Sequence, residues 1–114
     1  MSEDRELLEA AAKAAGISIY FDCVGQCCKR VPDEPLTTYL WNPIEDNYDA
    51  FALMVKLNLL VMPYPHDKAV RVVIWHEDGK PPENEIVSWG TPPDPKAATR
   101  RAIVRAAAAI GGAK

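Results

Sequence analysis

The alternating run Ala69–His76 is the strongest constraint on the fold. From Val70 to Ile74 every second residue is apolar and β-branched, so these side chains fall on one face of an extended strand. Residues 77–80 (Glu-Asp-Gly-Lys) have the composition of a tight turn, and Glu85–Trp89 has strand character again. The sequence therefore predicts a β-hairpin with one face toward a core.

Three further segments have helical spacing: residues 2–15, about 45–57, and 95–110. The last has the clearest boundaries, because Asp94 is a good N-cap, Pro95 suits the first helical position and Gly111 can end the helix. The first helix is predicted to bury a face made mostly of alanine, which lets it lie close to its neighbour.

Short β-branched or aromatic runs at Ile17–Phe21, Thr37–Leu40 and Leu59–Met62 predict additional strands, and Asp22–Leu36 is predicted to be one long loop. Short antiparallel strands with helices set on them indicate a layered arrangement. We predict an α+β fold: a two- or three-layer sandwich with a mainly antiparallel sheet of three to five strands and N-terminal, middle and C-terminal helices. Residues 1–114 are expected to form a single domain.

Charge and hydropathy narrow the classes of partner. A net charge of −3 argues against a protein built to neutralise many phosphates, so direct nucleic-acid binding is not expected. No uninterrupted apolar run is long enough for a transmembrane helix, and no membrane association is predicted. The acidic start Ser2–Glu6 lacks an apolar signal core, which favours a cytoplasmic location.

Cys23, Cys27 and Cys28 raise the question of a metal or a nucleophile. A tetrahedral site would need a fourth ligand such as His66 or His76, and a catalytic thiol would need one of these histidines as a base. No second ligand pair has recognisable spacing, and an odd number of cysteines argues against a disulfide framework. We expect buried or free thiols, with no metal, no cofactor and no catalytic residue.

Other catalytic patterns have little support. Asp46 and Asp49, with Glu45 beside them, could form an acid pair or a metal site, but acidic residues in the first turn of a helix are more often caps and partners of the helix dipole. A phosphate-binding glycine loop, HExxH and GxSxG do not occur in the sequence. The chain is therefore not expected to be an enzyme.

Two groups of residues on the predicted helices are candidates for binding. Tyr48, Phe51 and Val55 form a second apolar strip on the middle helix, which would mark an interface if exposed and would be core if the 22–36 loop covered it. The last helix carries four cations, which could hold an acidic partner or could form a solvated face. These cations are Lys96, Arg100, Arg101 and Arg105.

Three segments together resemble a known group of proteins. They are Leu7-Leu8-Glu9-Ala10-Ala11-Ala12-Lys13-Ala14-Ala15-Gly16-Ile17, then Trp41-Asn42-Pro43-Ile44-Glu45-Asp46 with Asp49-Ala50-Phe51 and Lys56-Leu57, and Ala97-Ala98-Thr99-Arg100-Arg101-Ala102-Ile103-Val104-Arg105-Ala106-Ala107. They resemble small proteins of tailed phages and prophages, of the phage ABA sandwich and NinX-like kind, and the likeness covers about half the chain.

The resemblance implies an α/β sandwich and no established enzymatic activity. We interpret the familiar residues as a fold motif, with Trp41 packing over Pro43 and either Asn42 or Asp46 capping the middle helix. Asp49 belongs to the same motif. Arg105 is expected to reach an acidic group or a carbonyl near this turn.

Size, acidic charge and the resemblance together predict a non-enzymatic phage accessory protein that binds a host macromolecule, most concretely a host protein in the bacterial cytoplasm. An anti-defence inhibitor, for example of a CRISPR complex, is one form. One alternative is a small-ligand or nucleotide binder that uses Arg100 with a stacking aromatic such as Trp89. Another is a virion or assembly component, which a homodimer or larger oligomer built on Tyr48, Phe51 and Val55 would favour.

Overall fold

The structure is a computed structural model that describes residues 2–22, 25–30, 38–75, 79, 81–90 and 93–111. Within these residues the chain forms three helices and six strands. In chain order they are α1 (Ser2–Ala15), β1 (Ile19–Phe21), β2 (Cys27–Arg30), β3 (Thr38–Leu40), α2 (Asn47–Lys56), β4 (Leu60–Tyr64), β5 (Ala69–Ile74), β6 (Glu83–Ser88) and α3 (Pro95–Ile110).

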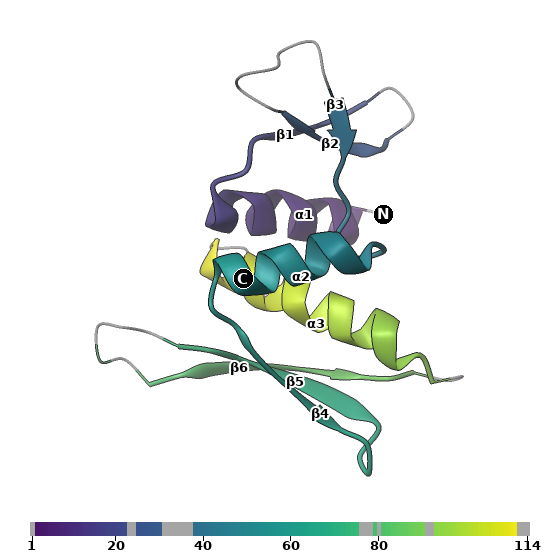
Figure 1. The fold of residues 1–114 in the computed structure, drawn as a ribbon, viewed down its shortest axis with the longest axis vertical. Helices are drawn as coiled ribbons and strands as arrows, with labels where there is room; N and C mark the ends of the chain where they lie inside the picture. The colour runs from purple at the N-terminus through teal and green to yellow at the C-terminus, as the bar shows by residue number, and fades with distance from the viewer. Residues whose placement is uncertain are drawn as a thin grey trace.

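The helices lie between two sheets (Figure 1). One sheet has the strand order β1-β2-β3 and the other has the order β4-β5-β6, and all four strand pairs are antiparallel. Helix α3 packs on β5 and β6, and both α1 and α2 pack on α3. The predicted α+β class and the three helices are therefore confirmed, and the strands divide between two sheets where the sequence analysis expected one.

The β4–β6 sheet has the two faces that the alternation predicted. Val70, Val72 and Ile74 are buried in the main core cluster with Ile103 of α3. On the opposite face, Val73 is also buried, whereas Trp75, directly after β5, is exposed. Apolar area removed from water stabilises a fold by roughly 25 cal/mol per Å², and this shared cluster is what holds α3 against the sheet.

Small residues join α1 to α3. Ala11 and Ala12 of α1 are buried, as are Ala102 and Ala106 of α3, so the two helices approach closely with little side chain between them. Gly16 ends α1 at φ 72°, in the left-handed region that glycine adopts without strain. Its N–H donates to the Lys13 carbonyl and that of Ile17 to the Ala12 carbonyl, which together form a Schellman cap.

The start of α3 follows the prediction. The Asp94 side chain accepts a hydrogen bond from the Ala97 N–H at 3.0 Å, and Pro95 occupies the first helical turn. The helix ends at Gly111, whose N–H donates to the Ala107 carbonyl.

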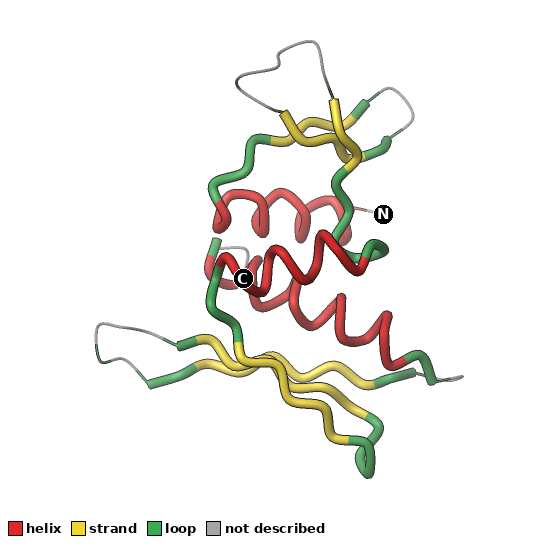
Figure 2. Tube along the Cα trace, viewed as in Figure 1, coloured by secondary structure: helices red, strands yellow, loops and turns green. Residues whose placement is uncertain are grey.

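One prediction about the fold was wrong. Residues 22–36 were expected to form a single loop, but Cys27–Arg30 is a strand that pairs with β1 and β3 (Figure 2). The segment has no apolar alternation, so the period of the side chains gave no signal, and the strand is held by backbone pairing on both sides. Residues 23, 24 and 31–36 lie outside the described residues.

In the described part of the chain, no helix combines the length and apolarity needed to cross a lipid bilayer.

Candidate functional site

The turn before α2 fixes the direction of that helix. Asp46 is its N-cap, and the Asp46 carboxylate accepts a hydrogen bond from the Asp49 N–H at 2.8 Å. The Asp49 carboxylate in turn accepts from the Asn42 N–H at 2.9 Å, which closes the turn back onto the helix. Of the two caps that the sequence left open, Asp46 is the one observed, while the Asn42 side chain accepts from the Ile44 N–H.

Arg100 ties this turn to α3. Its Nε donates to the Ile44 carbonyl at 2.9 Å, and its Nη1 donates to the Asn47 side-chain oxygen at 2.7 Å. Arg105 was expected to reach this turn, and that prediction was wrong. Arg105 lies further along α3, where its Nε is 3.6 Å from the Glu85 carboxylate of β6. Arg105 follows Arg100 by five residues, which is nearly one and a half helical turns, so the two side chains reach different neighbours.

The apolar strip on α2 is exposed. Tyr48, Phe51 and Val55 have exposed fractions of 76, 60 and 55 %. The opposite side of the helix is the packed one, where Ala50 and Leu53 are buried. The sequence left open whether this strip is buried or exposed, and the structure shows that it is exposed. We refer to Tyr48, Phe51 and Val55 as the α2 patch.

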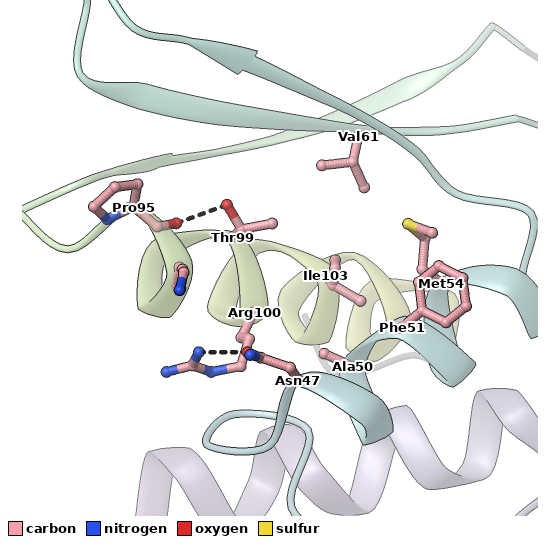
Figure 3. Close-up of a pocket in the computed structure, with 10 residues that line it drawn as sticks. Asn47, Ala50, Phe51, Met54, Val61, Pro95, Thr99, Arg100 and Ile103 are labelled. Carbon is pink, nitrogen blue, oxygen red and sulfur yellow. Dashed lines mark hydrogen bonds between the residues drawn. The ribbon is translucent and has the colours of Figure 1, made fainter.

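A pocket of about 430 Å³ adjoins the α2 patch (Figure 3). Phe51 belongs to both the patch and the pocket wall, with Met54 beside it on α2. Val61 of β4 lies on the opposite wall, and Thr99 and Ile103 of α3 lie between the two. Helix, strand and helix thus enclose a largely apolar hollow that opens beside the patch.

The polar groups of this pocket gather at one end. Asn47, Lys96 and Arg100 line it there, next to the first turns of α2 and α3. The Asp94 carboxylate already caps the N-terminus of α3, so the positive charge at this end of the pocket comes from Lys96 and Arg100. The pocket therefore favours an apolar group with a negative charge next to it.

The cations predicted as one group on α3 are separated by the fold. Arg101 pairs with Asp4 of α1 at 3.1 Å, and Arg105 faces Glu85, while Lys96 and Arg100 lie at the pocket. Of the six side chains proposed for binding, the structure brings Phe51 and Arg100 into one pocket. Partly exposed ion pairs contribute about 0–1 kcal/mol to the free energy of unfolding. Arg101 therefore links α3 to α1, and Arg105 links α3 to β6, with little gain in stability.

A second pocket, of about 340 Å³, lies at the other side of α2 near the end of α1. Trp41 and Asp49 line it, with Tyr48 and Lys56 from α2 and Lys29 from β2. Burial raises the pKa of the Asp49 carboxyl, and the nearby Asp46 carboxylate adds to the rise, although the hydrogen bond from Asn42 opposes it. Trp41 and Asp49 of the fold motif therefore line a partly polar pocket, which the sequence did not predict.

Among the described residues, Cys27 and Cys28 do not form a recognisable chemical site. Cys27 and Cys28 are free and buried on β2, and burial raises the pKa of the Cys27 thiol to about 11. A thiol with that pKa is a poor nucleophile near neutral pH. Among the described residues, no three His, Cys, Asp or Glu side chains come together as a metal site. Cys23 and His76 lie outside the described residues.

The sequence indicated several members of the pocket without indicating the pocket itself. Phe51 was placed on an apolar strip of the middle helix, and Val61 was placed in a strand. Their convergence depends on how α2, α3 and β4 pack, which neither residue's local pattern encodes.

No family model matches the chain, and no curated protein matches its sequence.

Proposed function

We propose that this chain is a non-enzymatic bacteriophage accessory protein that binds a host protein through the α2 patch and the adjoining pocket. The observation that carries the proposal is the exposure of Tyr48, Phe51 and Val55 along one helix face beside a hollow of about 430 Å³. Exposed contiguous apolar surface of this kind marks interaction sites on folded proteins.

A protein partner fits this surface better than a nucleic acid. Aromatic residues and methionine are enriched at the centres of protein interfaces, and Tyr48, Phe51 and Met54 supply both kinds here. Exposed Glu45 and Lys56 at the two ends of the helix supply a polar rim. The net charge of −3 works against the counterion release that drives binding to a phosphate backbone.

The phage setting of the proposal is supported by the resemblance of the three sequence segments to small proteins of tailed phages. In that setting the protein acts in the cytoplasm of the bacterial host, and an inhibitor of a host defence system is one concrete form. The buried Cys27 thiol has a raised pKa and is unsuited to nucleophilic attack, which argues against a catalytic role for this residue.

A second candidate function is the binding of a small ligand. The pocket volume falls within the usual range of roughly 300–1,000 Å³ for ligand sites. A nucleotide would be favoured by an indole facing Arg100, but the aromatic residue in the pocket wall is Phe51, and Trp89 is not part of that wall. A shift in melting temperature with a panel of nucleotides, absent in Phe51→Ser, would support this alternative.

The proposal is tested by affinity capture from the host bacterium with two matched variants. Phe51→Ser removes an exposed apolar side chain from the α2 patch, and Ile86→Ser removes a similarly exposed one from the outer face of β6. We expect one host protein to be retained by the wild type and by Ile86→Ser and to be lost with Phe51→Ser. Equal retention by all three proteins would exclude the α2 patch as the binding surface.

A further inference from the structure

We infer that the groove between α2 and β4 binds an extended segment of the partner protein, which adds to the free edge of β4 as a fourth strand of the β4–β6 sheet. This inference deepens the proposed function and rests on it, because the α2 patch borders the same groove. It names the form of the partner: an extended strand with an apolar side chain and an acidic side chain close to it in sequence.

The first observation is the position of β4. In the part of the chain that the structure describes, β4 pairs on one side alone, with β5, so its other side is an edge. The side chain of Val61 faces the pocket from this strand, and α2 forms the opposite wall (Figure 3). An added strand would lie about 4.8 Å from β4, along the opening of the pocket.

The second observation is that this edge carries no charged side chain, so Pro63 is its one protecting residue. Natural sheets often place charged residues on an edge strand to prevent pairing with other chains. The other edge strand, β6, carries Glu83 and Glu85, whereas β4 reads Leu-Val-Met-Pro-Tyr and has no charged residue. The β6 edge is therefore protected by charge, whereas the β4 edge is interrupted by Pro63 alone and keeps other backbone groups for pairing.

Pro63 sets which backbone groups β4 offers. A proline in a strand is placed so that its missing N–H would face away from the neighbouring strand, so Pro63 faces the free edge and Val61, two residues before it, faces the same way. The edge then presents the Val61 N–H as a donor and the Val61 and Pro63 carbonyl oxygens as acceptors. A second copy pairing β4 with β4 would bring two prolines into one ladder, whereas a different segment can supply N–H groups to both carbonyls.

The side chains of an added strand find two different environments. Alternate residues point to the same face, so those on the pocket side would enter the hollow lined by Met54, Val61 and Ile103. Towards the start of α3, Lys96 and Arg100 provide positive charge. The occupant is therefore an extended segment with an apolar residue for the hollow and an acidic residue for this end.

The test uses a displayed library of random linear twelve-residue peptides selected on the wild-type protein, followed by amide hydrogen exchange measured by NMR with a synthetic selected peptide. We expect slowed exchange of the Val61 amide on binding. The Val61→Pro variant removes that N–H and should weaken binding about tenfold, while Ile86→Pro, which puts a proline on the other edge strand, β6, should bind within about threefold of wild type.

Three outcomes would overturn the inference. They are recovery of no peptide, binding without protection of the Val61 amide, and a Val61 amide already protected by self-association of the free protein. In each of these cases the proposed function would still stand if a host protein were captured in a Phe51-dependent manner. Failure to capture such a protein would exclude the proposed function, whatever the result of the peptide test.

Discussion

The guanidinium of Arg100 on α3 donates to the backbone carbonyl of Ile44, in the turn before α2, at 2.9 Å. The two residues are 56 positions apart, and through Asn47 the same side chain also reaches the first residue of α2. The contact sets α2 against α3 at the end of the pocket where the charges gather. The same arginine thus holds the fold motif together and lies in the candidate site.

Replacement of Arg100 should destabilise the fold more than replacement of Arg105. Arg100→Ala leaves the partly buried Ile44 carbonyl without its charged donor, and we expect a loss of about 1–2 kcal/mol in the free energy of unfolding. Arg105→Ala removes an exposed pair at 3.6 Å and should cost under about 1 kcal/mol. Urea denaturation of the two variants measures the difference. Equal losses in the free energy of unfolding would show that the hydrogen bond to Ile44 contributes no more than the Arg105–Glu85 pair.

Asp49 should show opposite effects with two substitutions. Its folded-state pKa is raised, so the ionised carboxylate is less favourable in the folded than in the unfolded protein, and this penalty is relieved as pH falls through the folded pKa towards 3.8. Asp49→Asn keeps an acceptor for the Asn42 N–H and should be more stable than wild type at pH 7, with the advantage shrinking in acid.

Asp49→Ala removes that acceptor and should lose about 1–2 kcal/mol at pH 7. Unfolding free energies of wild type and both variants from pH 3.5 to 7.5 give the comparison. An Asp49→Asn protein that is less stable than wild type at neutral pH, with the difference fading in acid, would mean that the carboxylate stabilises the turn.

Cys27 should remain a thiol well into the alkaline range. Burial raises the folded-state pKa of the Cys27 thiol to about 11. The contribution of the neutral thiol to the free energy of unfolding is therefore fully present below the unfolded-state pKa and is lost as pH rises from about 9 towards 11. Cys27→Ala should flatten that part of the stability curve. Mass-spectrometric mapping of iodoacetamide labelling at pH 8 should find Cys27 unmodified in the folded protein, and rapid labelling would contradict its burial.

Gly111 should tolerate no side chain. Its φ is −75°, so the constraint is space: an added Cβ would lie well inside van der Waals contact with the Ala10 carbonyl of α1. We expect Gly111→Ala to cost about 1–3 kcal/mol through displacement of α1 from α3. Gly16→Ala is the matched control, since there the Cβ would meet open space and the cost of about 1 kcal/mol comes from the positive φ. Thermal unfolding distinguishes the two sizes of effect.

Most of the fold could be predicted from the sequence because the strongest signals in the sequence are local. Alternation from Val70 to Ile74 and the cap at Asp94 each specify an element without reference to the rest of the chain, and both were predicted correctly. Strand β2 had no such signal, since Cys27–Arg30 is a strand by virtue of its two neighbours. The division into two sheets was missed for the same reason.

The candidate site was predictable in part. The apolar strip on α2 follows from helical spacing, but whether Tyr48 and Phe51 face solvent depends on what packs over them, and local pattern does not encode that. The pocket depends on three elements meeting, and Arg105 was assigned the contact that Arg100 makes because spacing alone does not rank two arginines on one helix.

The most direct test of whether the α2 patch binds a host protein is site-specific photo-crosslinking in the host cell. A photoreactive phenylalanine analogue replaces Tyr48, the most exposed residue of the α2 patch, and in a control chain it replaces Ile86 on the outer face of β6. We expect one host protein to be crosslinked from position 48 and not from position 86. Crosslinks from position 48 to a second copy of the chain alone, or the same products from both positions, would contradict it.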